Sequence, residues 1–391
     1  YETYEYLLYL GVDPDNKDCD GENILFQGGL GLNSIKEVIS YGADVLNINL
    51  ENSTAATVAF GSVTAANVET INITTVDTGK IGTDGVNVLA TQDTATLAAT
   101  SATKIVVTGN NGLNLTNIGN TKVTTFDASA VAGDNVEDTA AALGVVYASA
   151  TTVAANTADT VVTIIGGAGN DVLTGNDTKD TITGGAGSDL ITGGANSDTI
   201  NVGSGRDAIS YSTTDAGVTD SSTAAFDSIN NFTMATAITT GVDLAGATAA
   251  AVQGKLATST AGGKDMSLLV LNATTSAAAN QAITVEGNAT ALAGQHAGVT
   301  YTIKDGILTL GGTGASTVDT LGEWLTEAAA VAATNGDALA FQFGSDTYAF
   351  VQNGNADLLV KLVGVTGAAA FAETAASTTG ADKTIYCAGI A

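Results

Sequence analysis

Basic, aromatic and proline residues are scarce in this chain of 391 residues. Twelve lysines and arginines face 40 aspartates and glutamates, so the formal net charge is −28, and aromatic residues make up 5%. Binding to a phosphate backbone needs clustered basic side chains, and Arg206 is the only arginine, so we expect no nucleic-acid partner. The excess of negative charge favours cations as partners.

Histidine and cysteine are also rare, which limits catalysis and disulfide formation. His296 is the only histidine, so the two or three histidines of a zinc hydrolase are missing, and no G-x-S-x-G nucleophile motif occurs. We therefore expect no enzymatic activity and place His296 in a surface turn. Cys19 and Cys387 lie near opposite ends of the sequence, and we expect two separate thiols. No apolar run is long enough to cross a bilayer, so we expect no membrane span.

Residues 166–210 form an array of five contiguous nine-residue units. Position six of each unit is an aspartate and position eight is leucine or isoleucine. The aspartates are Asp171, Asp180, Asp189, Asp198 and Asp207. The pattern predicts a glycine-rich turn of six residues followed by a short strand whose middle side chain points inward. A flexible glycine-rich linker would not keep five inward apolar residues in register.

Two units make one coil, so alternate aspartates stack in columns. Asp171, Asp189 and Asp207 form the first column, and Asp180 and Asp198 form the second. Because coils lie about 4.8 Å apart, two bare carboxylates would repel by roughly 3 kcal/mol, and each column needs a cation. Carboxylates together with turn carbonyls are all-oxygen ligands, which favour Ca²⁺.

This array resembles the nonapeptide repeats of the RTX family of secreted bacterial proteins. The resemblance implies a parallel β-roll in which each Ca²⁺ is held by aspartates one coil apart and by carbonyls of the glycine-rich turns. Carried over by position, the implied sites are Asp171 with Asp189, Asp189 with Asp207, and Asp180 with Asp198. The turn glycines of these implied sites are Gly167, Gly169, Gly185, Gly187, Gly194 and Gly205.

The two columns differ at position four of the turn. The first column keeps glycine there, whereas Thr178 and Asn196 replace it in the second column. Asparagine tolerates the left-handed backbone region, but the β-branched threonine does so less readily. We therefore predict that the second column binds Ca²⁺ more weakly.

Residues 43–165 precede the array and contain short strands rich in valine, isoleucine and leucine. Five such segments begin at residues 46, 68, 86, 104 and 122, and the last four are spaced evenly by the length of two nonapeptide units. This spacing predicts an irregular β-solenoid with coils of about the same length as the calcium roll, and a β-sandwich is the alternative. The segments also resemble the β-rich body of RTX-type surface-layer proteins.

The remaining regions complete a mainly β fold. Residues 1–42 are predicted to form a small helical module, in which Ser34 and Glu37 make a capping box. Residues 211–262 form a roll cap and linker, because residues 226–246 resemble the segment that closes RTX rolls. Residues 263–391 form a β-rich C-terminal domain with one helix, capped by Thr320 and Glu323, in which Trp324 belongs to the core.

The C-terminal region resembles the last domain of surface-layer and adhesin proteins exported by type I secretion. We therefore expect a structural protein of a bacterial surface layer, which is secreted unfolded, folds on Ca²⁺ binding and self-assembles on the extracellular cell surface. Its expected partners are further copies of itself in a homo-oligomeric lattice and a cell-surface polysaccharide. An RTX adhesin or a surface filament subunit is the alternative.

Overall fold

A computed structural model describes residues 20–27, 34–35, 44–52, 57–77, 92–132, 144–151, 160–212, 221–235, 266–272, 284–285, 289–353, 357–373 and 382–389. The chain divides into two compact units, residues 1–191 and residues 192–391. Each unit is described in turn.

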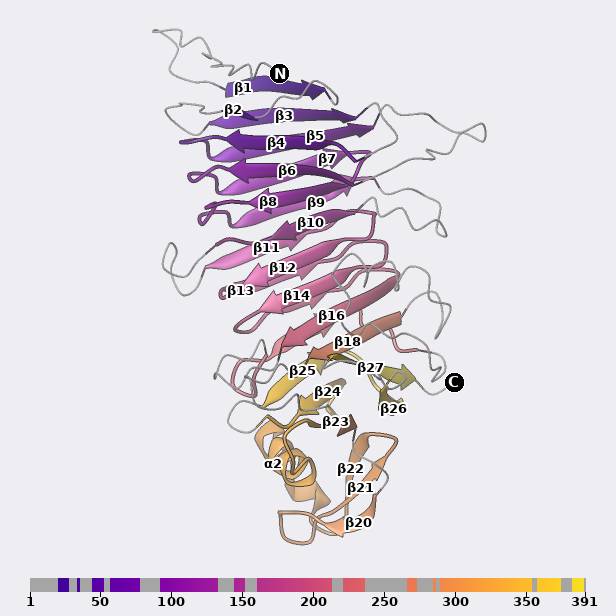
Figure 1. The fold of residues 1–391 in the computed structure, drawn as a ribbon. Helices are drawn as coiled ribbons and strands as arrows, with labels where there is room; N and C mark the ends of the chain where they lie inside the picture. Colours follow the sequence, from indigo (N-terminus) through magenta and orange to yellow (C-terminus); the bar gives the residue numbers. More distant parts are fainter. Residues whose placement is uncertain are drawn as a thin grey trace, which may run out of the picture. The chain divides into compact units, whose positions relative to one another are not determined.

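Unit 1 consists of two parallel sheets between which the chain alternates. The first sheet contains β1 (Asp20–Gln27), β3 (Val45–Asn52), β5 (Thr70–Asp77), β7 (Lys104–Gly109), β9 (Thr125–Val131), β11 (Val161–Ile165) and β13 (Lys179–Thr183). The second contains β2 (Ser34–Ile35), β4 (Ala59–Thr64), β6 (Asp93–Ala98), β8 (Leu113–Asn117), β10 (Val145–Ala148) and β12 (Val172–Asn176). β14 (Leu190–Gly194) spans the boundary to unit 2. Figure 1 shows the strands of unit 1 stacked coil upon coil.

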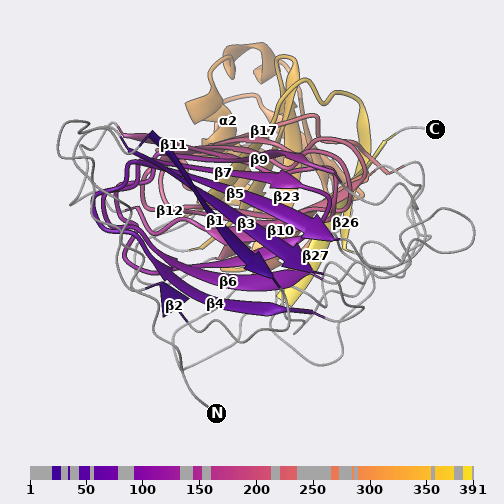
Figure 2. The ribbon, with the colours of Figure 1, turned by 90° about the horizontal axis from the view of Figure 1, so that it is seen from above.

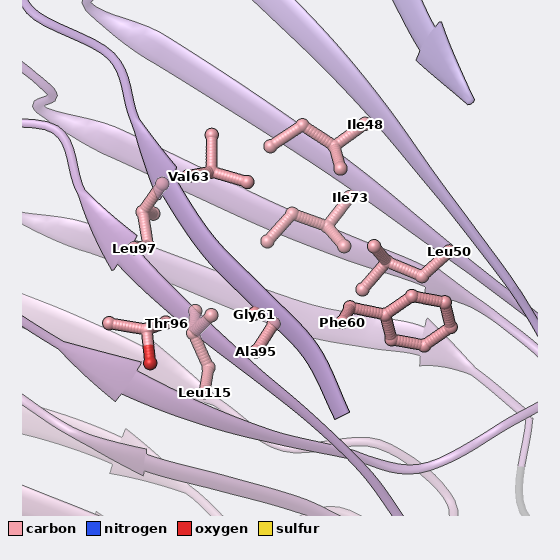
Figure 3. A pocket seen from close by; sticks show the side chains of 10 residues that line it. All are labelled: Ile48, Leu50, Phe60, Gly61, Val63, Ile73, Ala95, Thr96, Leu97 and Leu115. Atoms are coloured by element: carbon pink, nitrogen blue, oxygen red, sulfur yellow. The ribbon is translucent and has the colours of Figure 1, made fainter. Parts of the chain in front are cut away.

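The core of unit 1 lies between these two sheets. In Figure 2, which is seen from above, β3, β5 and β7 form one layer and β4 and β6 the other. Buried and half-buried residues alternate along β3 and β5, as expected for strands with one inward face. Figure 3 shows Ile48 and Ile73 of the first sheet together with Leu97 of the second around one shared apolar interior. Deeper in the stack, Phe126 lies flat on Tyr147, with ring centroids 3.8 Å apart.

The parallel pairing confirms the solenoid over the sandwich, because each strand pairs with the strand one coil later. Some coils are longer than expected, since the prediction was an irregular solenoid with coils of about the same length as the calcium roll. Ile164 pairs with Ile182 at the predicted offset of two nonapeptide units, but Ile48 pairs with Ile73 and Phe126 pairs with Ile164, both at longer offsets. The connecting loops absorb this variation. The segment expected at residues 86–90 lies outside the described residues.

The predicted N-terminal helical module is corrected where the structure describes it. Ser34 and Ile35 form strand β2, which pairs in parallel with β4, so the capping box expected at Ser34 is wrong. Residues 20–27 form strand β1 instead of a helix. Pairing with a neighbouring coil outweighs the local capping pattern, because helix propensity is a weak preference. The rest of the expected module lies outside the described residues.

Unit 2 also contains two sheets, in which parallel and antiparallel pairs are mixed. The first sheet contains β15 (Thr199–Asn201), β17 (Asp227–Asn230), β25 (Leu358–Leu362), β24 (Asp346–Val351), β23 (Asp337–Phe343), β22 (Ile307–Gly311), β21 (Thr300–Lys304) and β20 (Ala289–Ala293), in that spatial order. A short strand, β19 (Thr284–Val285), also pairs with β23. The second sheet contains β16 (Arg206–Ser212), β18 (Met266–Asn272), β27 (Asp382–Gly389) and β26 (Ala368–Glu373).

The predicted helix of the C-terminal region is confirmed as α2 (Leu321–Val331). Thr320 caps it, and both hydrogen bonds of the capping box with Glu323 are present. Trp324 stacks on Phe341 with ring centroids 5.3 Å apart and joins the apolar core beneath the helix, as expected. A short 3₁₀ helix, η1 (Ala315–Thr317), precedes α2. Among the described residues, neither α2 nor η1 has the length and apolar character that a helix needs to traverse a lipid bilayer.

Two turns lie on either side of strand β21. The turn Lys304–Gly306 joins β21 and β22, and its positive φ angles of 50° at Asp305 and 77° at Gly306 are those of a tight hairpin. His296 lies in a turn before β21, as expected, but its side chain is only 30% exposed. Its Nδ1 lies 2.6 Å from Oε1 of the fully buried Glu327 on α2. The histidine is therefore part of the packing of unit 2.

Candidate metal centre

The first predicted aspartate pair, Asp171 and Asp189, is brought together inside unit 1. Both side chains are fully buried. The backbone N–H of Asp171 donates to Oδ1 of Asp189 at 2.8 Å, and the N–H of Leu190 donates to the carbonyl oxygen of Asp171 at 2.8 Å. This reciprocal pair of bonds fixes the two aspartates one coil apart.

The carboxylate of Asp171 is held in place by backbone groups on two sides. Val145 N–H donates to its Oδ1 and Gly167 N–H to its Oδ2, each at 2.6 Å. Burial nevertheless raises the pKa of Asp171 to about 7, because the hydrogen bonds only partly offset the loss of solvent. A buried carboxylate in this position keeps its charge more readily when a cation lies beside it.

The glycine-rich turns bring backbone carbonyls close to the turn of the next coil. Gly185 has φ of 117°, and a Cβ there would come within 3.0 Å of the carbonyl oxygen of Gly167. Gly187 has φ of 115°, and a Cβ there would also come within 3.0 Å of the carbonyl oxygen of Gly169. The predicted glycines 167, 169, 185 and 187 therefore form two facing turns beside the aspartate pair.

The turn that precedes Asp180 is built differently. Its carboxylate accepts hydrogen bonds from Asn176 N–H at 2.8 Å and from the Thr178 hydroxyl at 2.9 Å, so both oxygens are engaged within one turn. Burial raises the pKa of Asp180 to about 6. In the next turn of the same column, Asn196 adopts a positive φ of 80° in place of glycine. The departure from the repeat geometry is thus centred on Thr178.

The remaining predicted residues lie in unit 2. Asp198 and Asp207 are buried, and the turn glycines Gly194 and Gly205 have positive φ of 105° and 120°. The implied pairs Asp189 with Asp207 and Asp180 with Asp198 are each divided between the two units. These two pairings therefore stay predictions.

Asp227, which was expected to belong to the roll cap, also lies at a strand start beside a buried aspartate of the repeats. Asp227 is fully buried at the start of β17, and its Oδ1 accepts the backbone N–H of Asp198 at 2.8 Å. Ile229 pairs with Ile200, which occupies position eight of its repeat. Aspartate followed two residues later by isoleucine is the spacing of positions six and eight. The same spacing of aspartate and an aliphatic residue recurs outside the array, as at Asp44 and Leu46, so it does not identify the segment by itself.

The donor set fits Ca²⁺. Among the residues that the structure describes, no three His, Cys, Asp or Glu side chains are grouped so that they could hold a metal ion between them. A cation at Asp171 and Asp189 would thus be held by two carboxylates together with carbonyl oxygens of the facing turns. Hard oxygen ligands in a flexible loop are the donors that Ca²⁺ prefers.

Comparison with protein families supports this chemistry. Residues 163–189 and 174–209 match the RTX calcium-binding nonapeptide repeat. These RTX repeats include all five predicted aspartates, and they end before Asp227. Comparison with curated proteins gave no match. The RTX repeats thus account for one segment of the chain, and proteins that carry such repeats are typically secreted.

Proposed function

We propose that this chain is a structural subunit of a bacterial surface layer that folds on Ca²⁺ binding outside the cell and assembles with copies of itself. The buried pair Asp171 and Asp189 is the observation that carries the proposal. Two carboxylates locked one coil apart and shielded from solvent are stabilised by a divalent cation. Folding of the RTX segment is therefore linked to the concentration of Ca²⁺.

In this proposal the protein groups have separate tasks. Backbone N–H groups of Val145 and Gly167 orient the carboxylate of Asp171, and Asp171 N–H orients that of Asp189. Bound Ca²⁺ would supply the positive charge that compensates these buried carboxylates. A ligand that binds only the folded state stabilises it by RT ln(1 + [L]/Kd). With a Kd of about 10⁻⁴ to 10⁻³ M, the class of extracellular modules, millimolar Ca²⁺ favours the folded state and cytosolic Ca²⁺ does not.

Charge supports the extracellular and structural parts of the proposal. The net charge of −28 keeps the unfolded chain soluble during export, and outside the cell it allows Ca²⁺ to bridge neighbouring subunits. A cell-surface polysaccharide is the proposed anchor of the layer. We further propose that the chain has no catalytic activity of its own.

A filament or adhesin subunit is the second candidate. The parallel coils of unit 1 stack in a single direction, as Figure 1 shows, and such stacks suit growth along one axis. A lattice needs contacts in two directions, whereas a filament needs them in one.

A Ca²⁺ titration of the full chain tests both proposals. The chain is treated with EGTA and then followed by circular dichroism and electron microscopy as Ca²⁺ is added. A gain of strand signal with ordered sheets at millimolar Ca²⁺ supports the surface layer, and fibres support the filament. Strand content that ignores Ca²⁺ contradicts calcium-dependent folding, and folding without assembly contradicts both structural roles and favours an adhesin.

A further inference from the structure

Strand β17 repeats the hydrogen bonding of an RTX coil outside the RTX repeats. In unit 1, Asp171 N–H donates to Asp189 Oδ1, and Leu190 N–H donates to the carbonyl of Asp171. In unit 2, Asp198 N–H donates to Asp227 Oδ1 at 2.8 Å, and the residue after Asp227, Ser228, donates its N–H to the carbonyl of Asp198 at 2.9 Å. Asp198 and Asp227, the second aspartate pair, therefore have the same reciprocal bonds as Asp171 and Asp189.

The surroundings of the second aspartate pair match as well. Asp198 is 1% exposed and Asp227 is fully buried. A Cβ at Gly193 would come within 3.0 Å of Asp198 Oδ2, and a Cβ at Gly166 would also come within 3.0 Å of Asp171 Oδ2. Asp198 and Asp171 thus each lie over the first glycine of their own turn, where a larger side chain would occupy the space.

Ser221 holds Asp227 in this position. The backbone N–H of Asp227 donates to the Ser221 hydroxyl at 2.8 Å. Ser221 precedes a turn without glycine, in which Ser222 and Ala225 exchange backbone hydrogen bonds. A turn of different sequence therefore delivers an aspartate to the position that a nonapeptide turn would supply. This explains why the family match ends before it.

We infer that Asp227 is a Ca²⁺ ligand that, together with Asp198, extends the calcium-binding column by one coil beyond the RTX repeats. The inference rests on the proposed function, because it assumes that the aspartate pairs bind Ca²⁺. It adds a residue that lies 29 positions after Asp198 and outside the nonapeptide pattern. The end of the roll is then fixed by calcium at β17, where the first sheet continues into β25.

Asp93 supplies a matched control for this inference. Its Oδ1 accepts the backbone N–H of Val58 at 2.7 Å, which is the same kind of bond between coils. The side-chain amides of Asn52 and Asn111 also donate to this carboxylate, at 2.9 and 2.7 Å. Amide donors here take the place that a cation would take, so Asp93 should not bind Ca²⁺.

Counting bound Ca²⁺ on the full chain tests the inference. Equilibrium dialysis with radioactive Ca²⁺ compares the wild type with Asp227→Asn, Asp198→Asn and Asp93→Asn. Asparagine keeps the acceptor oxygen for Asp198 N–H and removes the charge. We expect Asp227→Asn to lose one Ca²⁺ per chain and Asp93→Asn to keep the wild-type number. Asp198→Asn should lose at least one, because Asp198 also belongs to the implied pair with Asp180. An unchanged number in Asp227→Asn overturns the inference, while a wild type that binds no Ca²⁺ overturns the proposed function itself.

Hydrogen exchange of the wild type covers the case in which Asp227→Asn does not fold. Ca²⁺ should slow exchange at the N–H groups of Asp198 and Ser228, as we also expect at those of Asp171 and Leu190. The expected slowing is at least tenfold for both pairs. Slowing confined to Asp171 and Leu190 overturns the inference and leaves the proposed function intact.

Discussion

Asp93 and Asp171 occupy one column of the second sheet of unit 1 and accept the same hydrogen bond. Asp93 pairs with Leu113, and Leu113 pairs with Val145. Val145 donates its N–H to Asp171 Oδ1 at 2.6 Å, just as Val58 donates to Asp93 Oδ1 at 2.7 Å. An aspartate that accepts the same hydrogen bond between coils as an RTX aspartate therefore lies well before the RTX repeats. It is surrounded by amides instead of turn carbonyls, so its chemistry should depend on pH rather than on Ca²⁺.

Replacing Asp93 by asparagine should flatten part of the pH dependence of stability. Loss of solvent raises the pKa of Asp93 from 3.8 to about 6. Because the folded state holds the proton more tightly, the contribution of Asp93 to stability is complete below pH 3.8 and is lost as pH rises through 6. The shift corresponds to at most about 3 kcal/mol, and solvent screening reduces it.

Urea unfolding at saturating Ca²⁺ between about pH 4.5 and 7.5 measures this effect. The wild type should lose stability relative to Asp93→Asn as pH rises. The half-buried Asp127, which accepts hydrogen bonds from Ser129, gives the control variant Asp127→Asn. Parallel curves for the wild type and Asp93→Asn would contradict the prediction.

Asp189→Asn should weaken Ca²⁺ binding more than Asp180→Asn. The asparagine at 189 keeps the acceptor for Asp171 N–H but removes one of two buried charges. Asp180 already shares its two oxygens with Asn176 N–H and the Thr178 hydroxyl, so less of its charge is available to a cation. We expect about a tenfold increase in Kd for Asp189→Asn, or about 1.4 kcal/mol, and a smaller one for Asp180→Asn. Calorimetric titration measures both, and equal changes would refute the difference between the two columns.

Gly185→Ala should destabilise unit 1 strongly. Its φ of 117° disfavours any side chain, and the new Cβ would meet the backbone carbonyl of Gly167. Strain of this kind costs about 1–3 kcal/mol before the collision is counted. Gly344→Ala is the matched control, because Gly344 also has positive φ, 64°, but no atom lies within 4 Å of the place its new methyl group would take. Thermal unfolding at saturating Ca²⁺ should show the larger loss for Gly185→Ala, and equal losses would disprove the close approach of the turns.

Glu327→Gln should destabilise unit 2 more than His296→Ala. The Glu327 carboxylate accepts hydrogen bonds from the N–H groups of Gln295 and His296, at 2.9 and 2.8 Å, and lies 2.6 Å from His296 Nδ1. Burial opposes its charge, but these hydrogen bonds outweigh burial and lower the pKa of Glu327. Hydrogen bonds to a buried charge contribute about 1.5–3 kcal/mol each, so we expect a loss of about 2–4 kcal/mol for Glu327→Gln and about 1 kcal/mol for His296→Ala.

The sign of the pH dependence gives a second readout for Glu327. Its lowered pKa means that its contribution is complete above its unfolded pKa of 4.5 and is lost as pH falls through the folded pKa. The difference in unfolding free energy between wild type and Glu327→Gln should therefore shrink in acid. A difference that grows in acid would contradict the assigned hydrogen bonds.

Sequence signals that act within a few residues predicted their elements well. The capping box of Thr320 and Glu323 begins α2, as predicted. The regular repeat identified the roll because both of its signals, aspartate and an inward aliphatic residue, recur at a fixed spacing. In each case the local backbone conformation decides the structure.

Features that depend on pairing between coils could not be predicted from sequence. Asp227 and Asp93 reach their positions through loops of irregular length, so no fixed period relates them to Asp171 or Asp198. At Ser34 a local pattern predicted the wrong element. The helix-capping pattern there is overridden by the pairing of β2 with β4. Which residues stack is determined by backbone hydrogen bonds between distant segments, and these leave no local pattern.

The unequal loops of unit 1 also bear on how such a protein can be altered. Ile164 pairs with Ile182 on one side and with Phe126 on the other, and the stretch of chain back to Phe126 is much the longer of the two. All three residues nevertheless belong to adjacent strands of one sheet. Doubling the length of a flexible loop costs only about 0.6 kcal/mol in closure entropy. Loops between coils could therefore be exchanged for longer ones. Foreign peptides could be displayed in these loops while the inward-facing residues are left unchanged.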